Sequence, residues 1–335
     1  MLKKNKPYII AEVGSNHLGK ENLSIQSIML AKKAGADCVK FQLFDENNLV
    51  NNKLKIYKHV EDKKLKYQYE RFKKVKISIE QVKKFSKLAK KIKIDFCVTP
   101  FDHNYVKKIK SYVSFFKVAS GDINNLELLK EISKTKKNVV ISSGMASLKE
   151  IKTALSFFPN KKVTLLHCIS NYPTPEKDAN LINIKYLKDK FNVNTGYSDH
   201  VSGIDVAAKS VFFGAKIIEK HFMPKKSKQA GDYKLSVDYK GLVQLIYQIN
   251  QNLEIIGKKR VNEFYCEKYG KKTLRRSIYF ANNLKKGSKI KKEILIFLRP
   301  LEIKGLKIEN YLKIIGKRVK QDVYKHQLVQ RKNFN

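Results

Sequence analysis

The stretch IIEKHF, Ile217 to Phe222, sets the first constraint on the fold. Its two leading isoleucines are typical of a strand that enters a core, yet three ionisable residues, Glu219, Lys220 and His221, follow directly. Such groups are costly to bury unless they are paired. A second stretch, GYSDH from Gly196 to His200, ends in the same way. Both predicted strands begin with apolar residues and end with ionisable ones. This pattern predicts a functional site formed jointly by the two strand ends.

Short apolar runs of this kind recur along the chain and predict buried strands. They are YIIAEVGS from residue 8, CVKFQLF from 38, IDFCVTPF from 94, FFKVASG from 115, NVVISSGM from 138, KVTLLHCIS from 162, VNTGYSDH from 193 and KIIEKHF from 216. Helical spacing lies between them at 23–33, 79–92, 126–132, 151–158, 182–191 and 206–213, and a long helix stopped by Gly257 follows. Eight strands alternating with helices over about 250 residues predict a (β/α)8 TIM barrel, which we assign to residues 1–262. The alternative, a doubly wound open sheet, would need a glycine-rich phosphate turn that EVGSNHLGK lacks.

The C-terminal region has a different pattern. From LRRSIYFANNLKKGSKIKKEILIFLRPLEI onward the apolar runs are short, KKG marks a turn, and helical spacing is limited to 308–315. We therefore predict a linker at 263–271 and a small β-rich domain at 272–335. A domain of this size buries little apolar surface, so we expect it to pack on the barrel or on another subunit.

Composition narrows the class of protein. The net charge is +40, but only 7 of the 70 basic residues are arginine, and lysine is scattered rather than interleaved with aromatic residues on one face. This pattern predicts a solvated surface and no nucleic-acid partner. The four cysteines lack metal-finger spacing, and no apolar segment approaches the ~20 residues of a membrane span. With no signal sequence at the N-terminus, we expect a cytoplasmic protein without a membrane partner.

Polar residues collect at the predicted carboxyl ends of the strands, where TIM barrels place their catalytic groups. Lys40 and Lys117 supply two cations that suit a small phosphorylated anion, together with hydroxyl donors from Thr99, Ser120, Ser142 and Ser198. His200 and His221 end the last two strands and have the chemistry to bind one divalent metal. Glu12 and Glu219 can complete that metal sphere or move protons. Taken alone, either histidine is as readily structural, so the prediction depends on the whole set.

Eight motifs in a fixed order carry a family resemblance. They are IAEVGSNHLGK, ADCVKFQLF, VTPFD, KVASGDINN, VISSGM, LLHCISNYPTP, GYSDH and EKHF. In this order they resemble the sialic acid synthase family, which condenses phosphoenolpyruvate with an N-acylated hexosamine. The later stretch RRSIYFANNLKKGSKIKKEILIFLRP resembles the antifreeze-like (SAF) domain of that family. The resemblance covers almost the whole chain.

The resemblance implies roles for individual residues. It implies catalysis by Glu12, Lys40, Lys117 and Glu219, and phosphoenolpyruvate binding by Lys40, Thr99, Lys117, Ser120, Ser142, Ser170 and Ser198. It implies sugar contacts from Gln42, Phe101, Asp122, Tyr172, Asp232 and Arg299. His200 and His221 match metal ligands for Mn²⁺ or Mg²⁺. Arg299 matches an arginine that enters the site of a neighbouring subunit, which implies a homodimer with swapped SAF domains.

The implied reaction joins phosphoenolpyruvate to the aldehyde of an open-chain sugar, adds water and releases phosphate by C–O cleavage. N-acetylmannosamine, giving N-acetylneuraminate, is the first choice of substrate. The alternative is a diacetamido-trideoxy hexose leading to legionaminic or pseudaminic acid, because AGDYKLS around Asp232 and RPLEIKG after Arg299 depart from the family pattern.

Other functions are less consistent with the residues. A synthase acting on a phosphorylated aldose would need further arginines for a second phosphate. An inactive sugar-binding scaffold is the non-enzyme alternative. Some relatives have arginine at the position of Lys220, and on that comparison we expect Lys220 to contact an anion in the site, with less bidentate character than arginine would have.

Overall fold

The computed structural model describes residues 6–57, 65–159, 162–257 and 264–334. The chain forms two compact units, 1–257 and 258–335, and each is described by itself. The predicted boundary between barrel and linker, at 262 and 263, lies outside the described residues. Within the predicted linker, Tyr265–Glu267 forms a 3-10 turn and helix α11 (Lys268–Leu274) begins.

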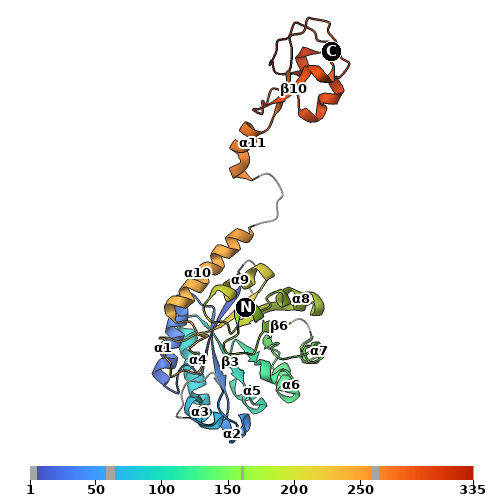
Figure 1. Ribbon diagram of the computed structural model, residues 1–335. Coiled ribbons are helices and arrows are strands. Elements are labelled where there is room, and N and C mark those ends of the chain that lie inside the picture. Colours follow the sequence, from blue (N-terminus) through green and yellow to red (C-terminus); the bar gives the residue numbers. More distant parts are fainter. Residues whose placement is uncertain (1–5, 58–64, 160–161, 258–263, 335) are drawn as a thin grey trace. The chain divides into compact units, whose positions relative to one another are not determined.

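The first unit is a closed barrel of parallel strands in sequence order, with β8 hydrogen-bonded to β1, as the strand pattern predicts (Figure 1). This arrangement confirms the TIM-barrel prediction over the open sheet. The strands are β1 (Tyr8–Gly14), β2 (Cys38–Leu43), β3 (Asp95–Pro100), β4 (Phe115–Val118), β5 (Val139–Ser142), β6 (Val163–Cys168), β7 (Asn194–Asp199) and β8 (Ile217–His221).

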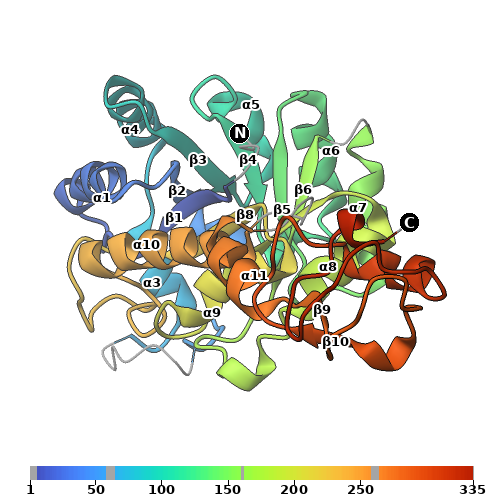
Figure 2. The same cartoon turned by 90° about the horizontal axis from the view of Figure 1, so that it is seen from above.

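Helices lie around the strands, as the view from above shows (Figure 2). They are α1 (Glu21–Ala34), α2 (Glu46–Leu49), α3 (Gln68–Val75), α4 (Ile79–Lys91), α5 (His103–Ile109), α6 (Leu126–Lys134), α7 (Leu148–Ser156), α8 (Ile182–Phe191), α9 (Asp205–Lys209) and α10 (Tyr239–Ile256). The sequence pattern did not predict α2, α3 and α5, because helices of four to eight residues show too little apolar periodicity. None of the described helices is long and apolar enough to cross a membrane.

Side chains alternate across the barrel wall, and β8 illustrates the consequence. Ile217 joins an inner cluster at the barrel axis, whereas Ile218 belongs to the larger core between strands and helices. Because successive side chains of a strand point to opposite faces, Glu219 and His221 share the inner face with Ile217. Lys220 shares the outer face with Ile218. The barrel therefore directs every second polar group of a strand end toward its axis.

The second unit is a small β-rich fold around its own core. Strands β9 (Ser277–Phe280) and β10 (Leu295–Leu298) pair antiparallel. Their core includes Ile278, Phe280 and Val329, all fully buried. The segment predicted as helical at 308–315 forms a 3-10 helix over Ile308–Ile314. This architecture agrees with the β-rich domain predicted from the short apolar runs.

Candidate active site

Four charged side chains form a charge cluster inside the barrel: Glu12 of β1, Lys40 of β2, Lys117 of β4 and Glu219 of β8. Lys40 Nζ lies 2.8 Å from Glu12 Oε2 and 3.6 Å from Glu219 Oε2, and Lys117 Nζ lies 3.8 Å from Glu219 Oε1. Each side chain is at most 5% exposed. The two lysines offset the cost of burying the two carboxyl groups at this depth.

Within the cluster, the pKa values of Glu12 and Glu219 are shifted in opposite directions. Burial alone would raise the pKa of Glu219, but the neighbouring Lys117 and Lys40 outweigh it and lower that pKa to about 2. Burial raises the pKa of Glu12, against the effect of Lys40 and with that of the Glu219 charge. Two neighbouring carboxyl groups whose pKa values are shifted in opposite directions are typical of a catalytic acid and a catalytic base. Glu219 is therefore the anion of the pair, and Glu12 is the group that holds a proton more readily.

Hydroxyl groups surround the two lysines. Lys117 Nζ donates to Ser142 Oγ at 2.7 Å, and Lys40 Nζ donates to Thr99 Oγ1 at 3.2 Å. Ser198 Oγ donates to Glu219 Oε1 at 2.9 Å. The structure thus brings these predicted phosphoenolpyruvate contacts together around the charge cluster. Ammonium and hydroxyl groups in this arrangement supply the donors that a phosphate or carboxylate requires.

Gly144 lets two hydroxyl groups approach its backbone closely. A Cβ at this position would overlap Ser170 Oγ and would come within 2.8 Å of Ser120 Oγ. The Gly144 backbone N–H donates to Ser120 Oγ at 3.2 Å. Ser170 Oγ is buried and has no hydrogen-bond partner in the described part of the chain. Because buried hydroxyl groups are normally bonded, Ser170 indicates a place for a polar ligand atom.

The two predicted metal-binding histidines lie next to each other at the ends of β7 and β8. Their ring centres are 5.4 Å apart, and the Tyr172 ring packs 4.2 Å from that of His200. His200 Nδ1 donates to the Ile169 carbonyl at 2.7 Å, which leaves Nε2 with a free lone pair. Burial lowers the pKa of His221 to about 3, so its ring stays neutral near pH 7. At His200 burial lowers the pKa, but Cys168 and the Ile169 carbonyl outweigh it and raise the pKa. A metal binds the neutral form of an imidazole, so it would compete with a proton at His200.

These residues fit a divalent metal with two protein ligands. His221 Nδ1 is buried without a hydrogen-bond partner among the described residues, and Asp232 Oδ2 lies 3.8 Å from it. The described residues contain no group of three or more His, Cys, Asp or Glu side chains arranged around one metal position. The remaining coordination positions of such a metal would therefore fall to water or to substrate oxygen.

The predicted sugar-binding residues divide into three sets. Gln42 donates to Glu12 Oε1 at 2.8 Å, while Tyr172 and Asp232 lie beside the histidines, so these three join the cluster. Phe101 packs edge-on against Phe44, 6.1 Å between ring centres, and Asp122 ends the 3-10 turn Ser120–Asp122, where burial raises its pKa. Arg299 is exposed and follows β10 in the second unit.

Lys220 does not contact an anion in the site, and this expectation was wrong. Its side chain is fully buried, donates to Asp199 Oδ2 at 2.7 Å and also donates to the Val201 carbonyl. Asp199 Oδ1 in turn accepts from the Val201 backbone N–H at 3.0 Å. The cause is the alternation of the strand, which turns Lys220 toward the helix layer while Glu219 and His221 face the axis. Lys220 and Asp199 therefore support the backbone that carries the two histidines.

Arg71, near the site, escaped the sequence analysis, and Asn16, just after β1, connects two segments beside the site. Arg71 of α3 is only 8% exposed and donates from Nη2 to Ser15 Oγ at 2.8 Å. Asn16 Nδ2 donates to the Phe222 carbonyl and to Ser236 Oγ, both at 3.0 Å, and so ties the end of β1 to the segment after β8. Arginine is scarce in this sequence, with 7 among 70 basic residues, and this scarcity is a signal that could have drawn attention to Arg71.

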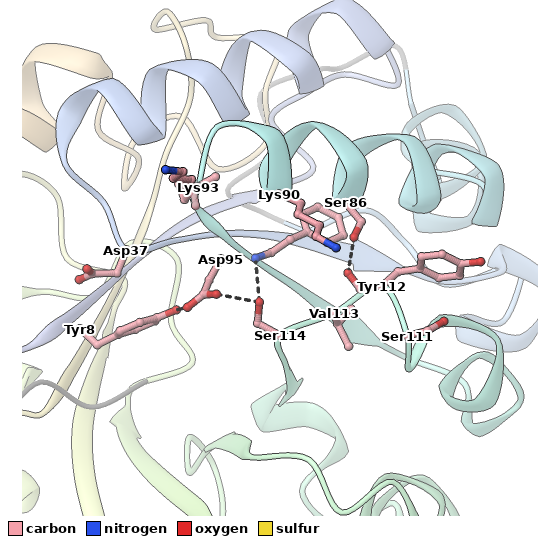
Figure 3. A pocket seen from close by; sticks show the side chains of 12 residues that line it. Tyr8, Asp37, Ser86, Lys90, Lys93, Asp95, Ser111, Tyr112, Val113 and Ser114 are labelled. Carbon is pink, nitrogen blue, oxygen red and sulfur yellow. Dashed lines mark hydrogen bonds between the residues drawn. The ribbon is translucent and has the colours of Figure 1, made fainter.

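A cavity of about 710 Å³ lies at the opposite end of the barrel, where the strands begin (Figure 3). Tyr8 donates its hydroxyl to Asp95, and Ser114 Oγ donates to the same carboxylate at 2.9 Å. Ser86 Oγ donates to the Tyr112 carbonyl at 2.6 Å. These polar groups are satisfied by one another, and the amino end of a TIM barrel is the end that serves stability. We therefore place the candidate active site at the carboxyl end.

Comparison with known proteins agrees with this geometry. Residues 27–261 match the NeuB family and residues 275–335 match the SAF domain. An N,N'-diacetyllegionaminic acid synthase of Campylobacter jejuni is 35% identical over 327 residues, 95% of this chain and 98% of that protein. An N-acetylneuraminate-9-phosphate synthase of Drosophila melanogaster is 30% identical, over 94% of this chain and 92% of that protein.

A solved structure gives the same result in three dimensions. The crystal structure of an N-acetylneuraminic acid (sialic acid) synthetase from Leptospira borgpetersenii serovar Hardjo-bovis superposes with a TM-score of 0.72 at 34% identity, covering 80% of this chain and 92% of that chain. The matches to the two family models span parts of both units, and the relatives are named as synthases of legionaminic acid, N-acetylneuraminate 9-phosphate and sialic acid. This chain belongs to the NeuB family and carries an SAF domain after its barrel.

Proposed function

We propose that the protein is a synthase that condenses phosphoenolpyruvate with an N-acylated hexosamine and water, giving a nine-carbon 2-keto acid and phosphate. The observation that carries this proposal is the charge cluster of Glu12, Lys40, Lys117 and Glu219, buried beside the neighbouring histidines His200 and His221. Buried ion pairs contribute little net stability. A sugar-binding scaffold would gain nothing from this arrangement, whereas an enzyme that handles an anion needs it.

Phosphoenolpyruvate carries a phosphate and a carboxylate, and the cluster offers one lysine for each. Burial lowers the pKa of Lys117, and a bound anion next to it favours the ammonium form. The carboxylates of Glu12 and Glu219 outweigh burial and raise the pKa of Lys40. The hydroxyl groups of Ser170 and Ser120, which lie close to the Gly144 backbone, add donors to the site. These residues bind and orient the anion by charge and by hydrogen bonds.

The two glutamates are placed to move protons in opposite directions. The C3 methylene of phosphoenolpyruvate forms the new bond to the aldehyde carbon, and Glu12 gives its proton to the aldehyde oxygen. Water then adds at C2, and Glu219 accepts one of its protons. The C2–O bond to phosphate breaks, the C2 hydroxyl becomes the ketone, and its proton leaves with the phosphate. Glu219 then releases its proton to solvent and Glu12 takes one up, which restores both groups and balances the sequence.

His200 and His221 are the residues that would hold a divalent metal, Mn²⁺ or Mg²⁺. When bound, such a metal acts as a Lewis acid that polarises the aldehyde oxygen. The protein's part is orientation: the Ile169 carbonyl sets the His200 tautomer, and the Tyr172 ring packs on the His200 face. These contacts leave the His200 Nε2 atom to face a ligand.

The proposal includes a homodimer in which Arg299 of one subunit reaches the other. Arg299 is exposed at the end of β10, and it lies in the segment that matches the SAF domain. We infer that the protein is a homodimer in which Arg299 contributes to the site of the partner subunit. The sugar is N-acetylmannosamine or a diacetamido-trideoxy hexose, since relatives named for both kinds of product match most of this chain.

A product assay tests the reaction. The purified chain is incubated with Mn²⁺, a panel of N-acylated hexosamines and phosphoenolpyruvate labelled with ¹⁸O in the bridging C–O–P position. We expect phosphate release with at least one sugar, a nine-carbon keto acid by mass spectrometry, and the label in the phosphate. Absence of phosphate release with every sugar would overturn the proposal. Label retained in the keto acid would contradict C–O cleavage.

Metal removal tests the role of the two histidines. After dialysis against a chelator, we expect phosphate release to fall to background and to return when Mn²⁺ is added, because the aldehyde is then polarised again. Electron paramagnetic resonance of Mn²⁺ measures binding without reference to turnover. His221→Ala should lose that binding, and His103→Ala, which changes a surface histidine of α5, is the matched control. Full turnover in the metal-free protein would contradict the role.

A further inference from the structure

Arg71 is a buried cation at the outer edge of the candidate site. It belongs to α3, in the long segment between β2 and α4, and the residue as a whole is 8% exposed. The described residues give it one hydrogen bond, from Nη2 to Ser15 Oγ at 2.8 Å. Because a guanidinium carries five N–H donors, several are left for a further acceptor. The charge cluster and the two histidines do not involve Arg71.

Gly231 is the reason that Arg71 fits where it does. A Cβ at Gly231 would overlap Nη2 and would lie within 3.1 Å of Nη1, so the guanidinium lies against the bare backbone of this residue. Gly231 belongs to the segment after β8 that also carries Asp232. A glycine at this point permits close approach of the arginine head group to that segment.

A short series of contacts connects Arg71 to His221, where the proposed reaction places the aldehyde of the sugar. Asp232 Oδ2 lies 3.8 Å from His221 Nδ1 and accepts from Ser15 Oγ at 3.4 Å. Ser15 in turn accepts from Arg71. The order His221, Asp232, Ser15, Arg71 therefore leads away from the histidines. A sugar whose aldehyde lies at the histidines would direct its later carbons toward Asp232 and Arg71.

We propose that Arg71 is a specificity-determining residue that, together with Asp232, binds a second acylamino group on the sugar, remote from the aldehyde. The preferred substrate is then a diacetamido-trideoxy hexose rather than N-acetylmannosamine. A secondary amide offers a carbonyl acceptor to the guanidinium and an N–H donor to the carboxylate, so both protein groups are satisfied at once. This inference rests on the function proposed above and narrows its substrate class.

The charges around Arg71 argue against a phosphorylated sugar. A phosphate would gain from the guanidinium but would also face the carboxylate of Asp232, which shares Ser15 with it. Like charges at such separations disfavour binding. A single hydroxyl can contact one of the two groups well but does not span a separate donor and acceptor. The neutral amide is the group that matches both.

The experiment compares the specificity constant, kcat/KM, for three sugars: a 2,4-diacetamido-2,4,6-trideoxy hexose, N-acetylmannosamine and its 6-phosphate. We expect the wild-type protein to prefer the diacetamido sugar. Arg71→Met should reduce that preference by about tenfold or more, the range expected for a hydrogen bond to a charged group. The loss should appear mainly in KM, because the contact is remote from the reacting carbon and is formed equally in the ground state.

Gly231→Ala provides a second route to the same result without changing a charge. The added methyl group displaces the guanidinium, so this variant should lower the preference as Arg71→Met does, and the two changes combined should lower it no further. Arg318→Met, which removes an arginine that bonds the Gly287 carbonyl in the second unit, is the matched control and should leave the preference intact. Binding of Mn²⁺ to each variant verifies that the histidine site is preserved.

The outcomes separate this inference from the proposed function. Phosphate release without a preference for the diacetamido sugar would overturn the inference and leave the synthase reaction in place. Equal losses for all three sugars in Arg71→Met would assign Arg71 a structural role instead. A preference for the 6-phosphate that is lost in Arg71→Met would show that the guanidinium binds phosphate, which also overturns the inference. Absence of phosphate release with any sugar would overturn the synthase itself.

Discussion

Replacing Lys40 with methionine is expected to lower kcat for phosphate release by about 10²- to 10³-fold, the typical effect of removing one preorganised charge partner in a site. Methionine fills the same space but supplies no ammonium group. Glu12 and Glu219, which lie 2.8 and 3.6 Å from Nζ, would then face a bound anion without compensation. Lys87→Met, an exposed lysine of α4, is the matched control and should retain full turnover. Unchanged turnover in Lys40→Met would contradict the assigned role.

The same variant tests the proposed assembly. Lys40→Met and Arg299→Ala should each be inactive alone if Arg299 enters the partner's site. Mixing the two after subunit exchange places an intact barrel opposite an intact Arg299 in about a quarter of the sites of a two-fold dimer, so about a quarter of the wild-type activity should return. Absence of recovery, with exchange verified by mass spectrometry, would place Arg299 in its own subunit's site or outside the site.

Replacing Lys220 with methionine is expected to reduce the free energy of unfolding by about 3–5 kcal/mol, since it breaks a buried pair and leaves one charge uncompensated. Lys220 is fully buried and Asp199 is 1% exposed, so neither group can turn to water. Urea unfolding at pH 7 measures the change. Replacing both residues, Lys220→Met with Asp199→Leu, should recover much of the loss because no charge is then left buried.

A matched control comes from a pair of the same chemistry at the surface. Lys285 bonds Asp322 at 3.0 Å, and the two side chains are 90% and 42% exposed. Lys285→Met should therefore cost far less than Lys220→Met, because water compensates the charge left behind. A loss in Lys220→Met no larger than that of Lys285→Met would contradict the structural role assigned to the inner pair.

Much of the barrel could be predicted from local patterns. The eight apolar runs matched the eight strands because a strand enclosed on both faces must be apolar for most of its length. The long helices followed from their 3.6-residue spacing, and Ile182–Phe191 agrees with α8 at both ends. Short helices such as α3 and α5 escaped, because few residues and many lysines give little periodic contrast.

The candidate site was predictable in part for the same reason. Glu12, Lys40, Lys117 and Glu219 could be grouped because the carboxyl ends of barrel strands converge on one place. Lys220 could not be placed, since the sequence shows it between two inward-facing groups without showing which face of the strand it occupies. Arg71 could not be associated with the site either, because its segment between β2 and α4 carries no strand-end signal and reaches Ser15 only in the folded chain.

The amino-acid sequence by itself determined the order of strands and helices, the ring of polar strand ends and the family, because each depends on residues that are close in the chain or on motifs in order. Tertiary structure alone decided which polar side chains meet. It set the separation in proton affinity between Glu12 and Glu219, turned Lys220 outward to Asp199, and brought Arg71 against Gly231. The physical reason is that charge interactions depend on distance and burial, and these exist only after the strands have closed into a barrel.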